Sequence, residues 1–71
     1  ILISAGFDAH ADDPLGGLML SADDFGDATK RIMELADRQS KGRVVSILEG
    51  GYNLQALGLC ASAHVRALMG I

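Results

Sequence analysis

The sequence contains few of the residues that define the common classes of small protein. Its single cysteine, Cys60, excludes both a disulfide scaffold and a cysteine-ligated zinc finger. Its three aromatic residues form no platform for stacking bases, and its six basic side chains include no basic run, so a nucleic-acid partner is not expected. No apolar stretch approaches a membrane span, and Ile1–Ile3 has neither the length nor the basic flank of a signal peptide. We therefore expect a cytoplasmic protein with no membrane partner.

Short apolar runs and amphipathic stretches make up most of the remaining chain. The two apolar runs, residues 1–5 and 44–48, do not alternate apolar with polar residues. Such continuous runs are typical of parallel strands covered on both faces. Between them, apolar residues recur at steps of three and four, which predicts an amphipathic helix. The predicted elements are a strand over about 1–5, a loop over 6–20, a helix over about 22–41, a strand over about 43–48, a turn over 49–53 and a helix over about 54–69. This order predicts an α/β fold, a right-handed βαβα unit.

The ends and the buried faces of both helices can also be predicted. Ser21, followed by Asp24 three positions later, forms a weak capping box at the start of the first helix. Gly42 suits the left-handed position beyond its end, and Asn53 suits the N-cap of the second helix. The residues expected on the buried faces are Phe25, Ala28, Ile32, Leu35 and Ala36 in the first helix and Leu54, Leu57, Ala61, Val65 and Leu68 in the second.

The chain is too short to cover two parallel strands by itself. A chain of about 70 residues buries only about 60% of its unfolded surface, and buried parallel strands need neighbours and cover on both faces. The first residue already lies within a predicted strand. We therefore interpret residues 1–71 as a C-terminal piece of a larger α/β domain, with the rest of that domain as its partner.

Ionisable side chains gather directly after the first predicted strand. Asp8, His10, Asp12 and Asp13 lie within six residues at the carboxyl end of that strand, where ligands bind in open α/β sheets. Carboxylates and an imidazole are suitable ligands for zinc or another divalent cation. The alternative is a solvated acidic turn, in which Asp8 bonds to nearby amides and Asp13 favours the turn that begins before Pro14.

A glycine-rich turn, Glu49–Asn53, follows the second predicted strand. Two glycines before a helix could cradle a phosphate, but neither a third glycine nor a Walker lysine is present. Alternatively, Gly50 and Gly51 allow a tight turn that presents the phenol of Tyr52 as a hydrogen-bond donor over a site. The third possibility is that Tyr52 is only a packed side chain.

Three sequence segments together resemble the histone deacetylase superfamily, which includes acetylpolyamine amidohydrolases and bacterial acetoin-utilisation-type proteins. The segments are Ser4–His10, Asp12–Leu18 and Leu48–Leu54. They occur in the family's order, and the Gly-Phe-Asp and Glu-Gly-Gly-Tyr forms are more similar to the class II and bacterial branches than to class I. The resemblance implies a parallel-sheet, three-layer domain of the arginase/deacetylase type.

The resemblance also implies roles for particular residues. Asp13 matches one of three zinc ligands, and Tyr52 matches the tyrosine that hydrogen-bonds the substrate carbonyl and the developing oxyanion. Asp8 is implied to support the loop rather than to bind metal, and His10 falls at a variable position. Further residues are implied in the substrate channel, Gly50 and Gly51 in its wall and Leu15 to Leu20 at its rim, with Leu15 and Leu20 as the bounding residues.

Several catalytic parts of this family are missing from the chain. The family's histidine pair and its upstream Asp-x-His ligands have no counterpart, because His10 and His64 are the only histidines and lie in other contexts. Cys60 and His64 have no third group to orient them, and we interpret them as packing or surface residues. This piece alone is therefore expected to be inactive.

Three functions follow from these features. The first is a fragment of a zinc-dependent amidohydrolase that acts on acetylated lysine, a polyamine or a small metabolite. The second is a non-catalytic module on the same fold that binds acetyl-lysine or a small ligand, and the third is a phosphate-binding α/β module. The rim that would select the substrate lies mostly outside the sequence.

Overall fold

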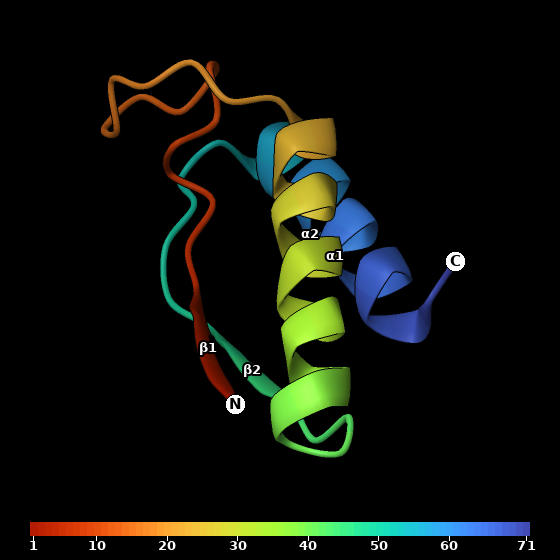
Figure 1. The fold of residues 1–71 in the computed structure, drawn as a ribbon. Helices are drawn as coiled ribbons and strands as arrows, with labels where there is room; N and C mark the ends of the chain where they lie inside the picture. Colours follow the sequence, from red (N-terminus) through yellow and green to blue (C-terminus); the bar gives the residue numbers. More distant parts are fainter.

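Two parallel strands and two helices form the computed structural model, which describes all 71 residues (Figure 1). The elements are β1 (Leu2–Ala5), α1 (Ala22–Gln39), β2 (Val45–Leu48) and α2 (Leu54–Met69). The predicted βαβα order is confirmed. The first helix ends two residues before its expected end at residue 41, and the second strand starts at residue 45 instead of 43. Neither helix combines the length and apolar character needed to cross a membrane.

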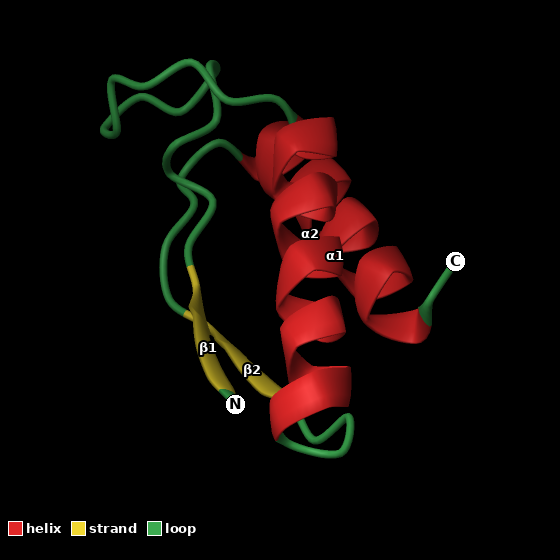
Figure 2. Ribbon diagram, in the orientation of Figure 1, coloured by secondary structure: helices red, strands yellow, loops and turns green.

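The sheet is covered on one face only. β1 and β2 pair in parallel, from Leu2 opposite Val45 to Ala5 opposite Leu48. Both helices lie on the same side of the strands (Figures 1 and 2). On the other side Leu2, Val45 and Ile47 are 79%, 54% and 59% exposed. The expected cover on both faces is therefore absent within this chain, because its two helices pack side by side on one face.

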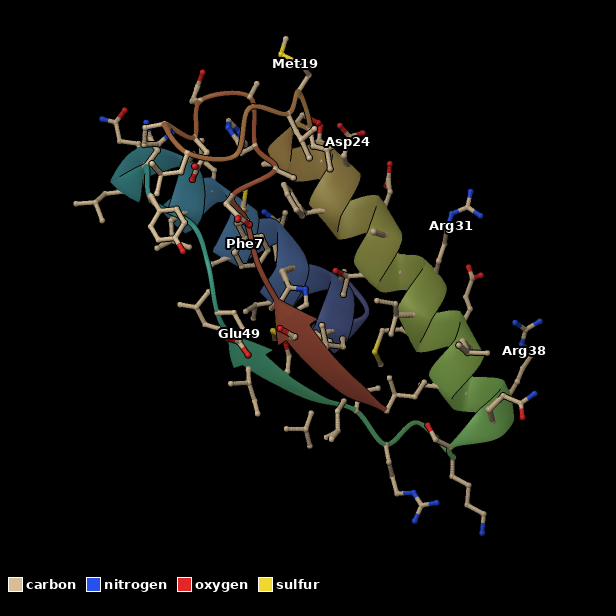
Figure 3. The ribbon with its side chains drawn as sticks, turned by 90° about the vertical axis from the view of Figure 1, so that its left-hand side faces the viewer. Phe7, Met19, Asp24, Arg31, Arg38 and Glu49 are labelled. Atoms are coloured by element: carbon tan, nitrogen blue, oxygen red, sulfur yellow. The ribbon has the colours of Figure 1, made fainter.

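The core lies between the sheet and the helices and is centred on Phe7. Ala5, Phe7 and Cys60 are buried there, and partly buried apolar side chains surround them. The Phe7 ring meets the Phe25 ring edge to face, with ring centres 5.2 Å apart, and lies 5.6 Å from the His64 ring in a similar arrangement. Because Phe7 is the second residue after β1, this packing anchors the start of loop 6–20 (Figure 3).

The buried helix faces are partly different from the predicted ones. In α1, Gly26, Thr29 and Ala36 are buried, whereas Ala28 and Leu35 are exposed. In α2, the buried residues are Ala56, Cys60, His64 and Ala67, whereas the predicted Leu54 and Val65 are exposed. Close approach of the helices explains the difference, since a Cβ placed on Gly26 would lie 3.5 Å from the Cβ of Ala63. Small residues line this contact, and the larger apolar residues face away from it.

Both ends of α1 have specific caps. The Asp24 N–H donates to Ser21 Oγ (3.2 Å) and the Ser21 N–H donates to Asp24 Oδ2 (2.8 Å), which confirms the predicted capping box. The backbone and side-chain hydrogen bonds from Ser21 lower the pKa of Asp24. Beyond the helix, Lys41 and Gly42 both have positive φ, and the Gly42 N–H donates to the carbonyl of Ala36 (2.9 Å).

His64 joins three elements in the interior. Its Nδ1 lies 2.7 Å from Thr29 Oγ1 in α1, and its Nε2 lies 2.8 Å from Ser46 Oγ in β2. Thr29 donates its own hydroxyl proton to the carbonyl of Phe25 (2.7 Å), so the His64 Nδ1 carries the hydrogen and Nε2 accepts from Ser46. Burial lowers the pKa of His64 and raises that of Cys60. Both are packing residues, as the sequence predicted.

Candidate functional site

Loop 6–20 and turn 49–53 meet at the carboxyl end of the sheet (Figure 1). The Phe7 N–H donates to the carbonyl of Gly50 (2.9 Å), which extends the strand pairing beyond β1 and β2. The Glu49 N–H donates to the carbonyl of Ala5 (2.9 Å). The parallel topology thus brings together two segments more than thirty residues apart, as expected for the carboxyl edge of such a sheet.

Asp13 connects the loop to the turn. Its carboxylate is 9% exposed, and Oδ1 accepts hydrogen bonds from the N–H groups of Leu15 (2.8 Å) and Gly16 (3.1 Å). Oδ2 accepts from the N–H of Tyr52 (2.8 Å), which lies in the other segment. The first two contacts are those of an Asx-type turn, whereas the third is a tertiary contact that no local pattern indicates.

The electrostatics of Asp13 favour its charged form. Burial acts to raise the pKa of this carboxyl group, but the surrounding backbone N–H donors, of which that of Tyr52 contributes most, outweigh burial. The net effect is a pKa below the ordinary value. Asp13 is therefore a carboxylate at neutral pH, although it is almost fully covered.

The donor set allows one cation contact from Asp13. An ionised carboxylate has about four lone-pair positions. Oδ1 accepts two N–H groups and Oδ2 accepts one, and the backbone of Asn53 also acts on the carboxyl group, so Oδ2 is the oxygen with more room for a cation. No three His, Cys, Asp or Glu side chains lie close enough together to hold a metal ion. Since protein zinc sites use three or four protein ligands, the chain fits as part of such a site.

The other ionisable residues of loop 6–20 do not converge on Asp13. His10 Nδ1 accepts the N–H of Asp12 (3.0 Å), which ties the ring to its own loop. The Asp8 carboxylate lies against two glycines, since a Cβ on Gly6 or Gly50 would be 3.2–3.3 Å from its atoms. No three side chains of the Asp8-to-Asp13 cluster considered as a ligand set therefore come together around one ion.

Glycines allow the loop and the turn to approach each other closely. Gly51 has φ of 136°, and a Cβ there would lie 2.9 Å from Leu57 Cδ1. A Cβ on Gly16 would lie 1.6 Å from the carbonyl oxygen of Asp8. Sequence reasoning identified Gly51 but missed Gly16, because its requirement comes from loop packing and not from a turn motif.

Tyr52 and Asn53 form the side of the turn nearest to Asp13. Tyr52 is 53% exposed, and its backbone N–H contacts the Asp13 carboxylate. Asn53 is the N-cap of α2, as predicted, with Oδ1 accepting the N–H of Ala56 (2.9 Å). Its Nδ2 also donates to the carbonyl of Asp12 (3.2 Å), a contact that the sequence did not indicate.

The expected rim residues are exposed apolar side chains. Leu15, Leu18, Met19 and Leu20 are all exposed, and Met19 points away from the body of the molecule (Figure 3). The segment is held by hydrogen bonds from the Leu20 N–H to Ala9 O (3.0 Å) and from the Ala11 N–H to Leu20 O (2.8 Å). This loop therefore presents apolar surface beside Asp13 on a backbone that is tied down at its base.

The turn is not available as a phosphate cradle. The Tyr52 N–H is used by the Asp13 carboxylate, and the Ala56 N–H is used by the Asn53 cap. A carboxylate at the N-terminal end of α2 also repels a second anion from that position. The arrangement therefore disfavours the phosphate-binding function considered from the sequence.

The fold and the candidate site define a unit of an α/β domain whose ionisable residues gather at the carboxyl ends of parallel strands. A family model described as "Histone deacetylase domain" matches residues 1–68. The chain belongs to the histone deacetylase family.

Individual relatives agree with this assignment. The chain is 53% identical over 68 residues to "Type-2 histone deacetylase 1" of Dictyostelium discoideum, covering 96% of this chain and 5% of that protein. It is 37% identical over 71 residues to "Histone deacetylase-like amidohydrolase" of Pseudomonas aeruginosa, covering all of this chain and 19% of that protein. The solved structure titled "Structure of the histone deacetylase Clr3" superposes with a TM-score of 0.87 at 40% identity, over 99% of this chain and 11% of that one. The chain thus spans less than a fifth of these proteins.

Proposed function

We propose that this chain is part of a zinc-dependent deacetylase that removes acetyl groups from acetyl-lysine or acetylpolyamine-type substrates. The contact that carries the proposal is the 2.8 Å hydrogen bond from the Tyr52 N–H to Asp13 Oδ2. It places an ionised carboxylate next to Tyr52, a residue that is 53% exposed. A metal ligand and an oxyanion donor are the two parts that amide hydrolysis would need from this edge of the sheet.

Asp13 would hold the zinc ion through Oδ2, together with ligands from outside this chain. The bound ion supplies a Lewis acid that polarises the acetamide carbonyl. The N–H groups of Leu15, Gly16 and Tyr52 fix the orientation of the Asp13 carboxylate.

Tyr52 would donate a hydrogen bond from its phenol to the substrate carbonyl oxygen as negative charge develops there. Gly50 and Gly51 would contribute backbone to the channel wall, because Asp8 and Leu57 lie where side chains at these two positions would extend. The exposed apolar segment Leu15–Leu20 would form part of the channel rim. These apolar surfaces suit the methylene stem of an acetylated lysine or polyamine.

General acid–base groups would come from outside this chain. His10 uses Nδ1 for the N–H of Asp12, and His64 uses both ring nitrogens inside the core. Buried His64 therefore has no ring nitrogen left for a substrate, and His10 retains only Nε2. The chain by itself is therefore inactive under this proposal.

The test is a Tyr52→Phe variant of the intact protein, assayed on an acetyl-lysine peptide and an acetylpolyamine with and without zinc. Removing one oxyanion donor typically costs about 10²- to 10³-fold in rate, and zinc content should be unchanged because the Tyr52 N–H remains. Wild-type turnover in this variant would contradict the role of Tyr52. Binding of the acetyl-lysine peptide to the wild type without hydrolysis would instead support a non-catalytic module.

A further inference from the structure

We propose that Asn53 is a positioning residue that clamps loop 6–20 to turn 49–53 and so keeps Asp13 and Tyr52 in register. This inference rests on the proposed function for its catalytic consequence. The clamp itself is a structural claim about two backbone segments, and it can be measured separately.

The Asn53 side chain performs two tasks at once. Its Oδ1 accepts the N–H of Ala56 at 2.9 Å and caps α2. Its Nδ2 donates to the carbonyl of Asp12 at 3.2 Å, across 41 positions of sequence. Because one planar amide makes both contacts, the orientation of the loop is linked to the first turn of α2.

The clamp lies next to the contact between the two proposed functional residues. Asp12 precedes Asp13 and Asn53 follows Tyr52, so two adjacent residue pairs connect the loop and the turn. The pair Tyr52–Asp13 uses Oδ2, the oxygen that would also bind the cation. A cation on that oxygen withdraws charge and weakens the hydrogen bond from the Tyr52 N–H. The pair Asn53–Asp12 uses no metal-binding atom, so it can hold the segments together when the ion is bound.

An asparagine at position 53 is suited to both roles, capping α2 and holding loop 6–20. Serine, threonine and aspartate cap helices about as well as asparagine, so capping alone does not require an amide. Among these residues only asparagine adds an N–H₂ donor for a carbonyl on a facing loop. Asn53→Ser therefore keeps the cap and removes the clamp without changing charge.

The experiment compares three variants of the intact protein. Asn53→Ser removes only the clamp, and Asn53→Ala removes the clamp and the cap. Gly70→Ala is the matched control, because Gly70 ends α2 with φ of 82° at the opposite end and has open space around it. Gly70→Ala strains the same helix without touching the site.

Four properties are measured for each variant. They are zinc affinity by chelator competition, the kinetic constants kcat and KM, Tm, and the amide exchange of residues 11–17. Asn53→Ser should weaken zinc affinity and lower kcat by about tenfold, the low end for groups that orient metal ligands, with little change in KM or Tm. Asn53→Ala should show the same losses and a lower Tm. Gly70→Ala should lower Tm and leave zinc affinity, kcat and loop exchange unchanged. Faster exchange in residues 11–17 should accompany both Asn53 variants.

Two results would overturn the clamp. Loop exchange and zinc affinity like those of the wild type in Asn53→Ser would show that the amide contact holds nothing in place. Equal losses in Gly70→Ala would show that general destabilisation of α2 is the cause. If the wild type has no zinc-dependent deacetylase activity but Asn53→Ser still speeds loop exchange, the clamp stands and the proposed function fails.

Discussion

Asp13 and its neighbour Asp12 differ in environment although both are aspartates before the same proline. The Asp13 carboxylate is covered and accepts three backbone N–H groups, whereas the Asp12 side chain is exposed and its carbonyl serves the Asn53 clamp. From their positions in the sequence alone, either Asp12 or Asp13 could bind a metal. Only the folded backbone gives Asp13 a fixed orientation and a pKa below the ordinary value.

We predict that Asp13→Ala in the intact protein abolishes zinc binding and deacetylation, because it removes the carboxylate that the backbone N–H groups of the loop and of Tyr52 orient. Zinc content by atomic absorption after dialysis measures this effect. Asp12→Ala is the control and should retain the metal, since its contribution is a backbone carbonyl that alanine also has. A full metal complement in Asp13→Ala would show that Asp13 is not a ligand.

The helices and strands are connected in the interior by polar contacts as well as by apolar packing. His64 in α2 contacts Thr29 in α1 and Ser46 in β2, and its ring lies beside Phe7. None of these contacts is charged. Nε2 accepts a hydrogen bond from the Ser46 hydroxyl only while the ring is neutral, so protonation of His64 removes this bond to β2 and places a charge in the core.

We therefore predict that the free energy of unfolding of the intact protein decreases as the pH is lowered below about 6.5, the ordinary pKa of histidine. Burial lowers the pKa of His64 in the folded state, so the unfolded state binds more protons in that window. The stabilisation that depends on neutral His64 is complete above about pH 6.5. It is lost as the pH falls toward the lowered pKa of His64 in the folded state. Thermal unfolding between pH 5 and 7 measures the slope, and His64→Gln should flatten it. An equally steep slope in that variant would exclude His64 as its origin.

The helix faces illustrate where element-level prediction succeeded and failed. The helical period, the helix caps and the order of the elements were predictable, because they depend on neighbours within a few residues. The Ser21–Asp24 capping box, for example, is confirmed. The predicted buried stripe of α2 was wrong at Leu54 and Val65, which are exposed, whereas the smaller Ala56 and Ala67 are buried. The approach distance of two helices is a tertiary property that the sequence of either one does not contain.

In the molecule as a whole, one face of the sheet has no cover from this chain. Leu2, Val45 and Ile47 project from that face, although continuous apolar strands of this kind are normally buried on both sides. The relatives are five or more times longer than the chain, so we propose that the rest of the domain covers this face.

We predict that Ile47→Asp destabilises the intact protein by about 3 kcal/mol or more, because it would bury an unpaired charge between layers. Urea unfolding followed by circular dichroism measures this change. Arg31→Asp, on the solvent side of α1 (Figure 3), should have little effect. A free energy of unfolding within about 0.5 kcal/mol of the wild type for Ile47→Asp, the range of ordinary surface changes, would mean that this face is open to solvent.

The sequence by itself determined the α/β class, the element order, both N-caps and the two loops in which functional residues lie. These follow from local periodicity, cap chemistry and the rule that parallel strands end at one edge. Only the tertiary structure decided that Asp13 reaches the backbone of Tyr52, that Asn53 reaches Asp12, and that His64 spans three elements. Each of these contacts joins residues between 18 and 41 positions apart. Their formation depends on how closely packed layers approach, which short-range sequence patterns do not specify.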